Sequence, residues 1–330
     1  MTSPVIAREF RNNTIENIHQ GAVCVIDQHK QIIYQKGDIQ KPTFYRSAMK
    51  PLQSIPIFKR KLVEQYHLTG EETALFTASQ RGELYHEEAL LSLANKIRIV
   101  EDKLICNESY PLNEGSKIAY IKSNKQKRAF LHNCAGKHMG FLAYVKEQQL
   151  DENYYDLSHP LQQEILSIVA TLSETPKHDI VTGIDGCGVP VFAVPLYNMA
   201  ISYLKFAYPS MIRDEETKDA VNQIAQIMND FPHIIASHRF ICTALLMDRN
   251  IVAKGGAQGV YCLALKKEKV SIALKVYSGT ELLWPLIVAE LLTKLNYTNT
   301  KTIDRLYALR SSVILNDHGK EVGHIELDLN

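Results

Sequence analysis

Strand-like segments lie near both ends of this 330-residue chain, and they constrain its fold more than any other feature of the sequence. In three places, two short runs rich in apolar and β-branched residues flank a polar turn, which is the pattern of a β-hairpin. The three predicted hairpins pair residues 21–27 with 32–37, 259–265 with 270–276, and 311–315 with 322–327. Because hairpins pair their strands antiparallel, the sheet is expected to be antiparallel or mixed.

Helical periodicity replaces the strand pattern between these hairpins. One apolar stripe comprises Leu90, Leu93, Ala94 and Ile97, and another comprises Leu161, Ile165, Ile168, Val169 and Leu172. Residues 214–231 and 281–295 are further amphipathic stretches, and Thr69 with Glu72 predicts a capping box. Strands at both ends with helices between them predict an α/β fold whose terminal strands share one sheet flanked by helices. We interpret residues 1–330 as one unit, built as a single body or as two subdomains.

The composition indicates a folded globular protein and excludes several function classes. Apolar residues make up 45% and charged residues 22%, and the formal net charge is +1. This charge balance provides no basic surface for nucleic acid or an anionic membrane. The apolar runs 189–196 and 282–292 are too short to span a bilayer, and the first residues lack a secretory pattern, so we expect a cytoplasmic protein. Six cysteines without a Cys-x-x-Cys pair do not indicate a disulfide framework.

Ser47 and Lys50 are three residues apart at a predicted helix start, where packing alone gives no reason for them. On a helix, residues i and i+3 share a face, so the lysine amine can reach the serine oxygen and act as its base. The amine must then be neutral, which requires a buried environment. Pro51 and Pro56 disfavour a regular surface helix here, and we expect this segment to be bent and buried.

A Ser-x-x-Lys pattern alone is weak, because Ser202 and Lys205 repeat it in an ordinary amphipathic segment. The first copy gains weight from later motifs. Ser-x-x-Lys enzymes of the β-lactamase and penicillin-binding type add a second serine motif and a later Lys-[Ser/Thr]-Gly strand. Here Ser79 begins Ser-Gln-Arg-Gly-Glu, and Lys254 begins Lys-Gly-Gly just before the second hairpin.

Cys134 and Cys187 each lie among glycines and polar residues rather than in an apolar run. Two cysteines from separate loops can share a zinc ion with a third ligand and water. His138 is the usual candidate for that third ligand, and Lys137 could bind only as a neutral amine. The alternative is a pair of buried free thiols beside turns, and the spacing of the cysteines leaves both readings open.

Taken together, five motifs resemble the Rhizobium etli-type L-asparaginases of the asparaginase II family. They are Arg46–Gln53, Ser79–Glu83, His132–His138, Asp185–Pro190 and Lys254–Val260, and they span nearly the whole chain in matching order. The resemblance implies a fold like that of serine β-lactamases, a homodimer, and hydrolysis of L-asparagine to L-aspartate and ammonia.

Residue by residue, the resemblance implies that Ser47 is the nucleophile and Lys50 its base. It implies a second Ser–Lys pair, Ser79 with Lys254, that relays protons and helps to hold the substrate. Substrate contacts are implied for Arg46, Asn133 and Asp185. A zinc site is implied for Cys134, Lys137 and Cys187, with a role in positioning the substrate more than in generating hydroxide.

Two departures from the family pattern concern the substrate preference. The family usually has His after the second serine and Glu in the Lys-x-Gly-Ala-Glu-Gly stretch, whereas this chain has Gln80 and Gln258. A glutaminase, or another Ser-x-x-Lys amidase acting on peptides or β-lactams, is therefore an alternative. A non-catalytic, zinc-dependent binding protein is another alternative, in which the two glutamines mark lost catalytic machinery.

Overall fold

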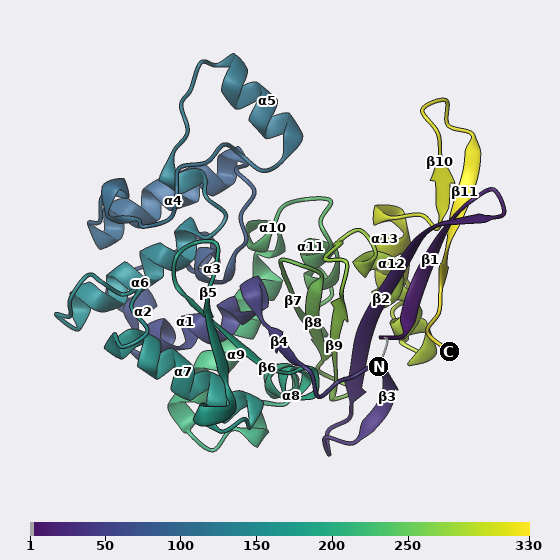
Figure 1. The fold of residues 1–330 in the computed structure, drawn as a ribbon. Helices are drawn as coiled ribbons and strands as arrows, with labels where there is room; N and C mark the ends of the chain where they lie inside the picture. The colour runs from purple at the N-terminus through teal and green to yellow at the C-terminus, as the bar shows by residue number, and fades with distance from the viewer. Residues whose placement is uncertain (1–2) are drawn as a thin grey trace. The chain divides into compact units, whose positions relative to one another are not determined.

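The computed structural model describes residues 3–330, which form two compact units (Figure 1). Unit 1 contains residues 3–48, 194–207 and 239–330, and unit 2 contains residues 49–193 and 208–238. Among the described residues, none of the helices is both long enough and apolar enough to cross a bilayer.

An antiparallel sheet forms the centre of unit 1. Its strands lie in the order β10-β11-β1-β2-β9-β8-β7, with β3 also paired to β2. The strands are β1 (Val5–Arg11), β2 (Thr14–Ile26), β3 (Ile32–Lys36), β7 (Ile251–Gly256), β8 (Val260–Leu265), β9 (Val270–Val276), β10 (Val313–Leu315) and β11 (Glu321–Leu327). All three predicted hairpins are confirmed, by the antiparallel pairs β2–β3, β8–β9 and β10–β11.

The two ends of the chain meet in this sheet, because β1 pairs antiparallel with β11 and Ala7 lies opposite Leu327. The predicted α/β class with an antiparallel sheet and flanking helices is confirmed. Strand β1 was not expected from the sequence, since its polar residues hide the alternation that marks a strand.

Helices cover both faces of the sheet in unit 1. The helices are α8 (Leu196–Ala207), α11 (Ile241–Leu246), α12 (Trp284–Lys294) and α13 (Thr300–Leu309), and a short strand, β4 (Pro42–Phe44), precedes the turn η1 (Arg46–Met49). On one face, Ser271 donates a hydrogen bond to the Ala200 carbonyl of α8 at 2.7 Å. On the other face, the Tyr261 ring lies 5.1 Å from that of Trp284 in α12. Every residue of β7 and β8 is therefore buried.

Unit 2 is mainly helical. Its helices are α1 (Lys50–Lys59), α2 (Leu62–Gln65), α3 (Gly70–Ala74), α4 (Leu84–Ile97), α5 (Glu114–Lys122), α6 (Ala135–Glu147), α7 (Pro160–Ser173), α9 (Glu215–Asp230) and α10 (Pro232–Ile235). The strand β5 (Val181–Ile184) pairs antiparallel with β6 (Pro190–Pro195). The helices predicted from periodicity correspond to α4, α7 and α9, and to α12 in unit 1.

The first helix of unit 2, α1, packs against α6, α7 and α9, and its residues 50–58 are all buried. Pro51 lies in the first turn, where a backbone N–H has no partner within the helix. Pro56 lies inside the helix, which still continues to Lys59. The burial expected for this segment is confirmed, and the segment is helical despite its two prolines.

Candidate active site

Lys50 begins α1 and its side chain is completely buried. The Lys50 Nζ atom donates hydrogen bonds to the Ala78 carbonyl at 2.6 Å, to the Asn133 carbonyl at 3.1 Å and to Ser79 Oγ at 3.1 Å. Its three acceptors come from two loops of unit 2, between 28 and 83 residues away along the chain. A buried amine held on a serine oxygen is the arrangement expected of a serine and its general base.

Ser79 follows the turn η2 (Leu75–Thr77) and is held at its backbone. Its N–H donates to the Ile235 carbonyl in α10 at 2.7 Å. The backbone of Ser79 is therefore fixed by this hydrogen bond, and its hydroxyl is contacted by the Lys50 amine. The family resemblance implies a pair of Ser79 with Lys254, whereas the contact between Lys50 and Ser79 is not expected from the sequence.

Gln80 connects the two loops that surround the Lys50 amine by hydrogen bonds of its side chain, which is only 1% exposed. Its Nε2 donates to the carbonyls of Phe130 and His132 at 3.0 and 2.8 Å, and its Oε1 accepts from the Gly82 N–H at 2.6 Å. Asn133 follows directly after His132. The amide thus fixes the Ser79 loop against the loop that presents the Asn133 carbonyl to Lys50.

The structure gives Gln80 a positioning role that the sequence did not reveal. A neutral histidine, the usual family residue here, has one N–H donor, whereas the amide has two. The only sequence signal was the departure of Gln80 from the family pattern.

In unit 1, Ser47 and Arg46 lie in the single turn η1, and both side chains are half-buried. The turn is held by Tyr203, whose hydroxyl donates to the Ala48 carbonyl at 2.7 Å. Strand β7 packs closely on the same turn, because a Cβ atom at Gly256 would lie 2.3 Å from the Tyr45 carbonyl oxygen. The fold therefore brings the Lys-Gly-Gly strand against the turn that carries Ser47.

Lys254 lies on β7 with its side chain 1% exposed. Its Nζ donates to the Gly255 carbonyl at 2.8 Å, and the Gly255 N–H donates to Cys242 Sγ at 3.3 Å. Gln258, the second departure from the family pattern, lies in the turn between β7 and β8 with a φ of 68°.

Cys134, Lys137 and Cys187 form a buried cluster at the start of α6, each no more than 3% exposed. The Lys137 Nζ atom donates to Cys187 Sγ at 3.0 Å. A hydrogen bond from Cys187, together with the nearby cations, holds the pKa of the Cys134 thiol well below its usual value. Burial favours the neutral form of Lys137, but the adjacent sulfurs outweigh that effect and raise its pKa. These shifts favour the thiolate form of Cys134 and the protonated form of Lys137.

The donor atoms of this cluster fit zinc. Sulfur and nitrogen are ligands that zinc prefers, and here two sulfurs and one amine converge in a buried place. Among the described residues, no three His, Cys, Asp or Glu side chains are grouped to hold a metal, so a site here requires the Lys137 nitrogen. Lys137 would have to release its proton when the ion binds.

Two neighbours of the cluster have defined contacts. Asp185 is half-buried in the turn between β5 and β6, and its carboxylate accepts from Cys187 Sγ at 3.8 Å. His138, the other candidate ligand, is completely buried, and its Nδ1 is hydrogen-bonded to the Tyr154 hydroxyl at 2.9 Å.

Comparison with known proteins places the chain in one family. The family profile described as L-asparaginase II matches residues 7–327. No curated protein sequence matches the chain.

Two solved structures share a distant likeness with the chain. A β-lactamase from Mycobacterium bovis is 12% identical, with 83% of this chain and 94% of that chain covered and a TM-score of 0.42. A Bacillus glutaminase is 13% identical, with coverages of 85% and 92% and a TM-score of 0.40. At these scores neither structure says anything about the reaction of this chain.

Proposed function

Because the chain belongs to the L-asparaginase II family, we propose that it hydrolyses the side-chain amide of L-asparagine to L-aspartate and ammonia. The observation that supports this proposal most is the completely buried Lys50 amine in contact with Ser79 Oγ. A structural lysine is rarely buried without a carboxylate partner. Within the described chain, the acceptors of the amine are one hydroxyl and two carbonyls, which suits a base.

As a proton acceptor, Lys50 would have to be a neutral amine. A neutral amine has two N–H donors and one lone pair. If the two donors bind the carbonyls of Ala78 and Asn133, the lone pair is left facing the Ser79 hydroxyl. The two carbonyls would therefore orient the base, and the Ser79 hydroxyl would exchange a proton with it.

In the proposed reaction, Ser47 Oγ attacks the side-chain amide carbon and Lys50 accepts its proton. Backbone N–H groups stabilise the resulting oxyanion. The C–N bond then breaks, the departing nitrogen takes up a proton, and ammonia leaves an acyl-enzyme ester on Ser47. Water attacks this ester: its hydroxide adds to the acyl carbon, the bond between that carbon and Ser47 Oγ breaks to release L-aspartate, and the remaining proton of the water returns to Ser47 Oγ. We propose that Ser79 and Lys254 relay these protons and help to hold the substrate.

For the remaining polar groups, we propose contacts to the two ends of the amino acid. Asp185 and Asn133 would bind its α-ammonium and α-carboxylate ends, and Arg46 would provide a further contact to the substrate. The Asp185 carboxylate is a natural partner for the α-ammonium group, and the Arg46 guanidinium is a natural partner for the α-carboxylate.

We also propose that Cys134, Lys137 and Cys187 hold zinc. When bound, the ion would supply a fixed positive charge that positions the substrate. A homodimer in the cytoplasm is proposed from the family resemblance as well, and light scattering of the purified protein tests the dimer.

The experiment that tests this function is a substrate comparison combined with two serine variants. Ammonia release is measured with L-asparagine and L-glutamine, and ring opening with a chromogenic β-lactam. We expect L-asparagine to be the preferred substrate. Ser47→Ala should abolish turnover, whereas Ser54→Ala should retain it, because the buried Ser54 hydroxyl donates only within α1, to the Pro51 carbonyl.

Acid quenching during turnover, followed by peptide mass spectrometry, identifies the nucleophile. An aspartyl ester on the peptide containing Ser47 is the expected product. An ester on Ser79 instead, with Ser47→Ala still active, would reassign the nucleophile to the serine that Lys50 contacts. No release of ammonia from either amide would contradict the proposed function and favour a binding protein.

A further inference from the structure

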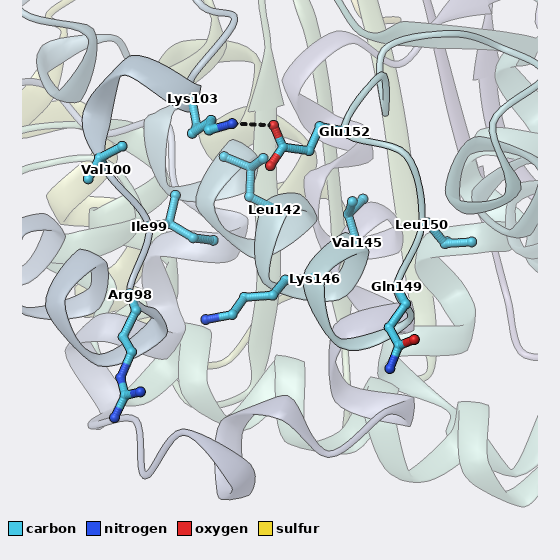
Figure 2. Close-up of a pocket in the computed structure, with 10 residues that line it drawn as sticks. All are labelled: Arg98, Ile99, Val100, Lys103, Leu142, Val145, Lys146, Gln149, Leu150 and Glu152. Carbon is cyan, nitrogen blue, oxygen red and sulfur yellow. Dashed lines mark hydrogen bonds and ion pairs between the residues drawn. The ribbon is translucent and has the colours of Figure 1, made fainter.

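A pocket of about 390 Å³ lies in unit 2 between the end of α4 and the end of α6 (Figure 2). Its volume is at the lower end of the range of small-molecule pockets, which is roughly 300–1,000 Å³. One wall comes from the residues after α4, including the turn η3 (Glu101–Lys103), and the other from α6 and the loop that follows it. The pocket thus lies entirely within one unit.

The middle of the pocket is apolar. Leu142 and Val145 project from α6, Ile99 projects from the opposite wall, and Figure 2 shows the three side chains between the charged groups. Leu142 and Val145 are only 4% and 1% exposed, so the apolar area open to a ligand comes mainly from the half-buried Ile99 and from Val100, which is 64% exposed. Such a surface suits an apolar group of a ligand, because contact removes apolar area from water.

Positive charge is in excess around this surface, since the lining contains three cations, Arg98, Lys103 and Lys146, and one carboxylate, Glu152. Lys103 is paired with Glu152 at 2.6 Å on one side of the pocket. Arg98 and Lys146 lie on the other side (Figure 2), and within the described chain neither forms an ion pair.

The contacts of Lys146 leave N–H donors for a ligand. Its ammonium group donates one hydrogen bond, to the Ile97 carbonyl at 2.9 Å, and has three N–H groups. Glu147, the adjacent acid on α6, accepts hydrogen bonds from the Gln65 amide and the Tyr66 hydroxyl instead. The two cations on this side therefore match a single anionic group, and a guanidinium suits the geometry of a carboxylate.

We propose that this pocket binds a small monocarboxylate with an apolar body, such as an arylacetate. The carboxylate lies between Arg98 and Lys146, and the ring packs on Ile99 and Val100. This site is distinct from the candidate active site, because Lys137 and Lys146 are nine residues apart on α6, or about 14 Å along the helix.

The test is a fluorine NMR titration of the full-length protein with 4-fluorophenylacetate. We expect saturable binding. 4-Fluorophenylacetamide, which has the same ring without the charge, should bind at least about tenfold more weakly, and so should trifluoroacetate, which has the charge without the ring. Binding should be unchanged by saturating L-aspartate, because the product occupies the other site.

Two variants test the charged side of the pocket separately. Lys146→Met and Arg98→Met should each weaken binding of 4-fluorophenylacetate by about fivefold and leave asparagine hydrolysis unchanged. Lys122→Met on α5 is the matched control and should leave the affinity unchanged.

Four results would overturn the proposal: no saturable binding, equal binding of the neutral amide, unchanged affinity in both pocket variants, or displacement by L-aspartate. The last result would place the probe in the active site.

Discussion

Replacing Gln80 with leucine should both destabilise the protein and slow turnover. Leucine has a similar size but removes two N–H donors and one acceptor from a side chain that is 1% exposed. The carbonyls of Phe130 and His132 and the N–H of Gly82 then lose their partner. At about 1 kcal/mol or more for each buried polar group left unsatisfied, the free energy of unfolding should fall by about 3 kcal/mol.

The same change should affect catalysis, because the Gln80 amide holds together the loops that carry Ser79 and the Asn133 carbonyl. A displacement of about 1 Å at these groups can cost as much as a hundredfold in rate. We expect kcat for L-asparagine to fall at least about tenfold, with a smaller change in KM. Urea unfolding and steady-state ammonia release measure the two effects.

Gln162→Leu is the matched control. Gln162 is also completely buried, but within the described chain it makes one hydrogen bond, to the Tyr154 carbonyl at 2.7 Å, and its Oε1 is buried without a partner. Leucine there loses one hydrogen bond and also removes the unpartnered oxygen, so the net change in stability should be near zero. An equal loss of stability in the two variants would refute the reasoning.

Three further predictions concern zinc, pH and packing. Cys134→Ser should lower the zinc content of protein purified without chelator, and atomic emission of wild type and variant measures it; equal zinc would contradict the assignment. Burial lowers the pKa of His86 from 6.5 to about 4, so the unfolded chain binds a proton that the folded chain excludes. The free energy of unfolding should therefore fall by about 3 kcal/mol as the pH falls from 6.5 to 4. Urea midpoints measured across this range should fall less in His86→Leu than in the wild type, and an equal fall would contradict the assignment to His86. Gly136→Ala should destabilise the protein by about 1–3 kcal/mol, because its Cβ would lie 2.3 Å from the Leu75 carbonyl oxygen, whereas Gly115→Ala on α5 meets no atom within 4 Å and should stabilise slightly; equal melting temperatures would contradict this.

Local patterns were sufficient to predict much of the fold. The hairpin β8–β9 and the helix α7 have strong periodicity and clear turn or capping residues, and both formed where expected. The capping box at Thr69 and Glu72 is also present. Strand β1 pairs with both β2 and β11, and it was missed because its polar residues obscure the strand alternation and no local pattern records its pairing with β11 at the other end of the chain.

The candidate site was predictable only as a set of residue types. The spacing of Ser47 and Lys50 identified a lysine at a helix start, and the structure places it there, buried. It could not identify the oxygens around the amine, because Ala78, Ser79 and Asn133 are brought to it by tertiary packing. For the same reason, the bridging role of Gln80 could not be seen from its neighbours in the sequence.

The most direct test of the account is ammonia and aspartate release from L-asparagine by wild-type protein and by Lys50→Met. Methionine keeps the length and apolar character of the lysine stem but has no amine. The account predicts at least a hundredfold loss of kcat/KM in this variant, on the order of the 10²–10⁴-fold contribution of a general base. Lys59→Met, on the same helix, should retain activity. Turnover by Lys50→Met at the wild-type rate would contradict the central claim that the Lys50 amine activates Ser47.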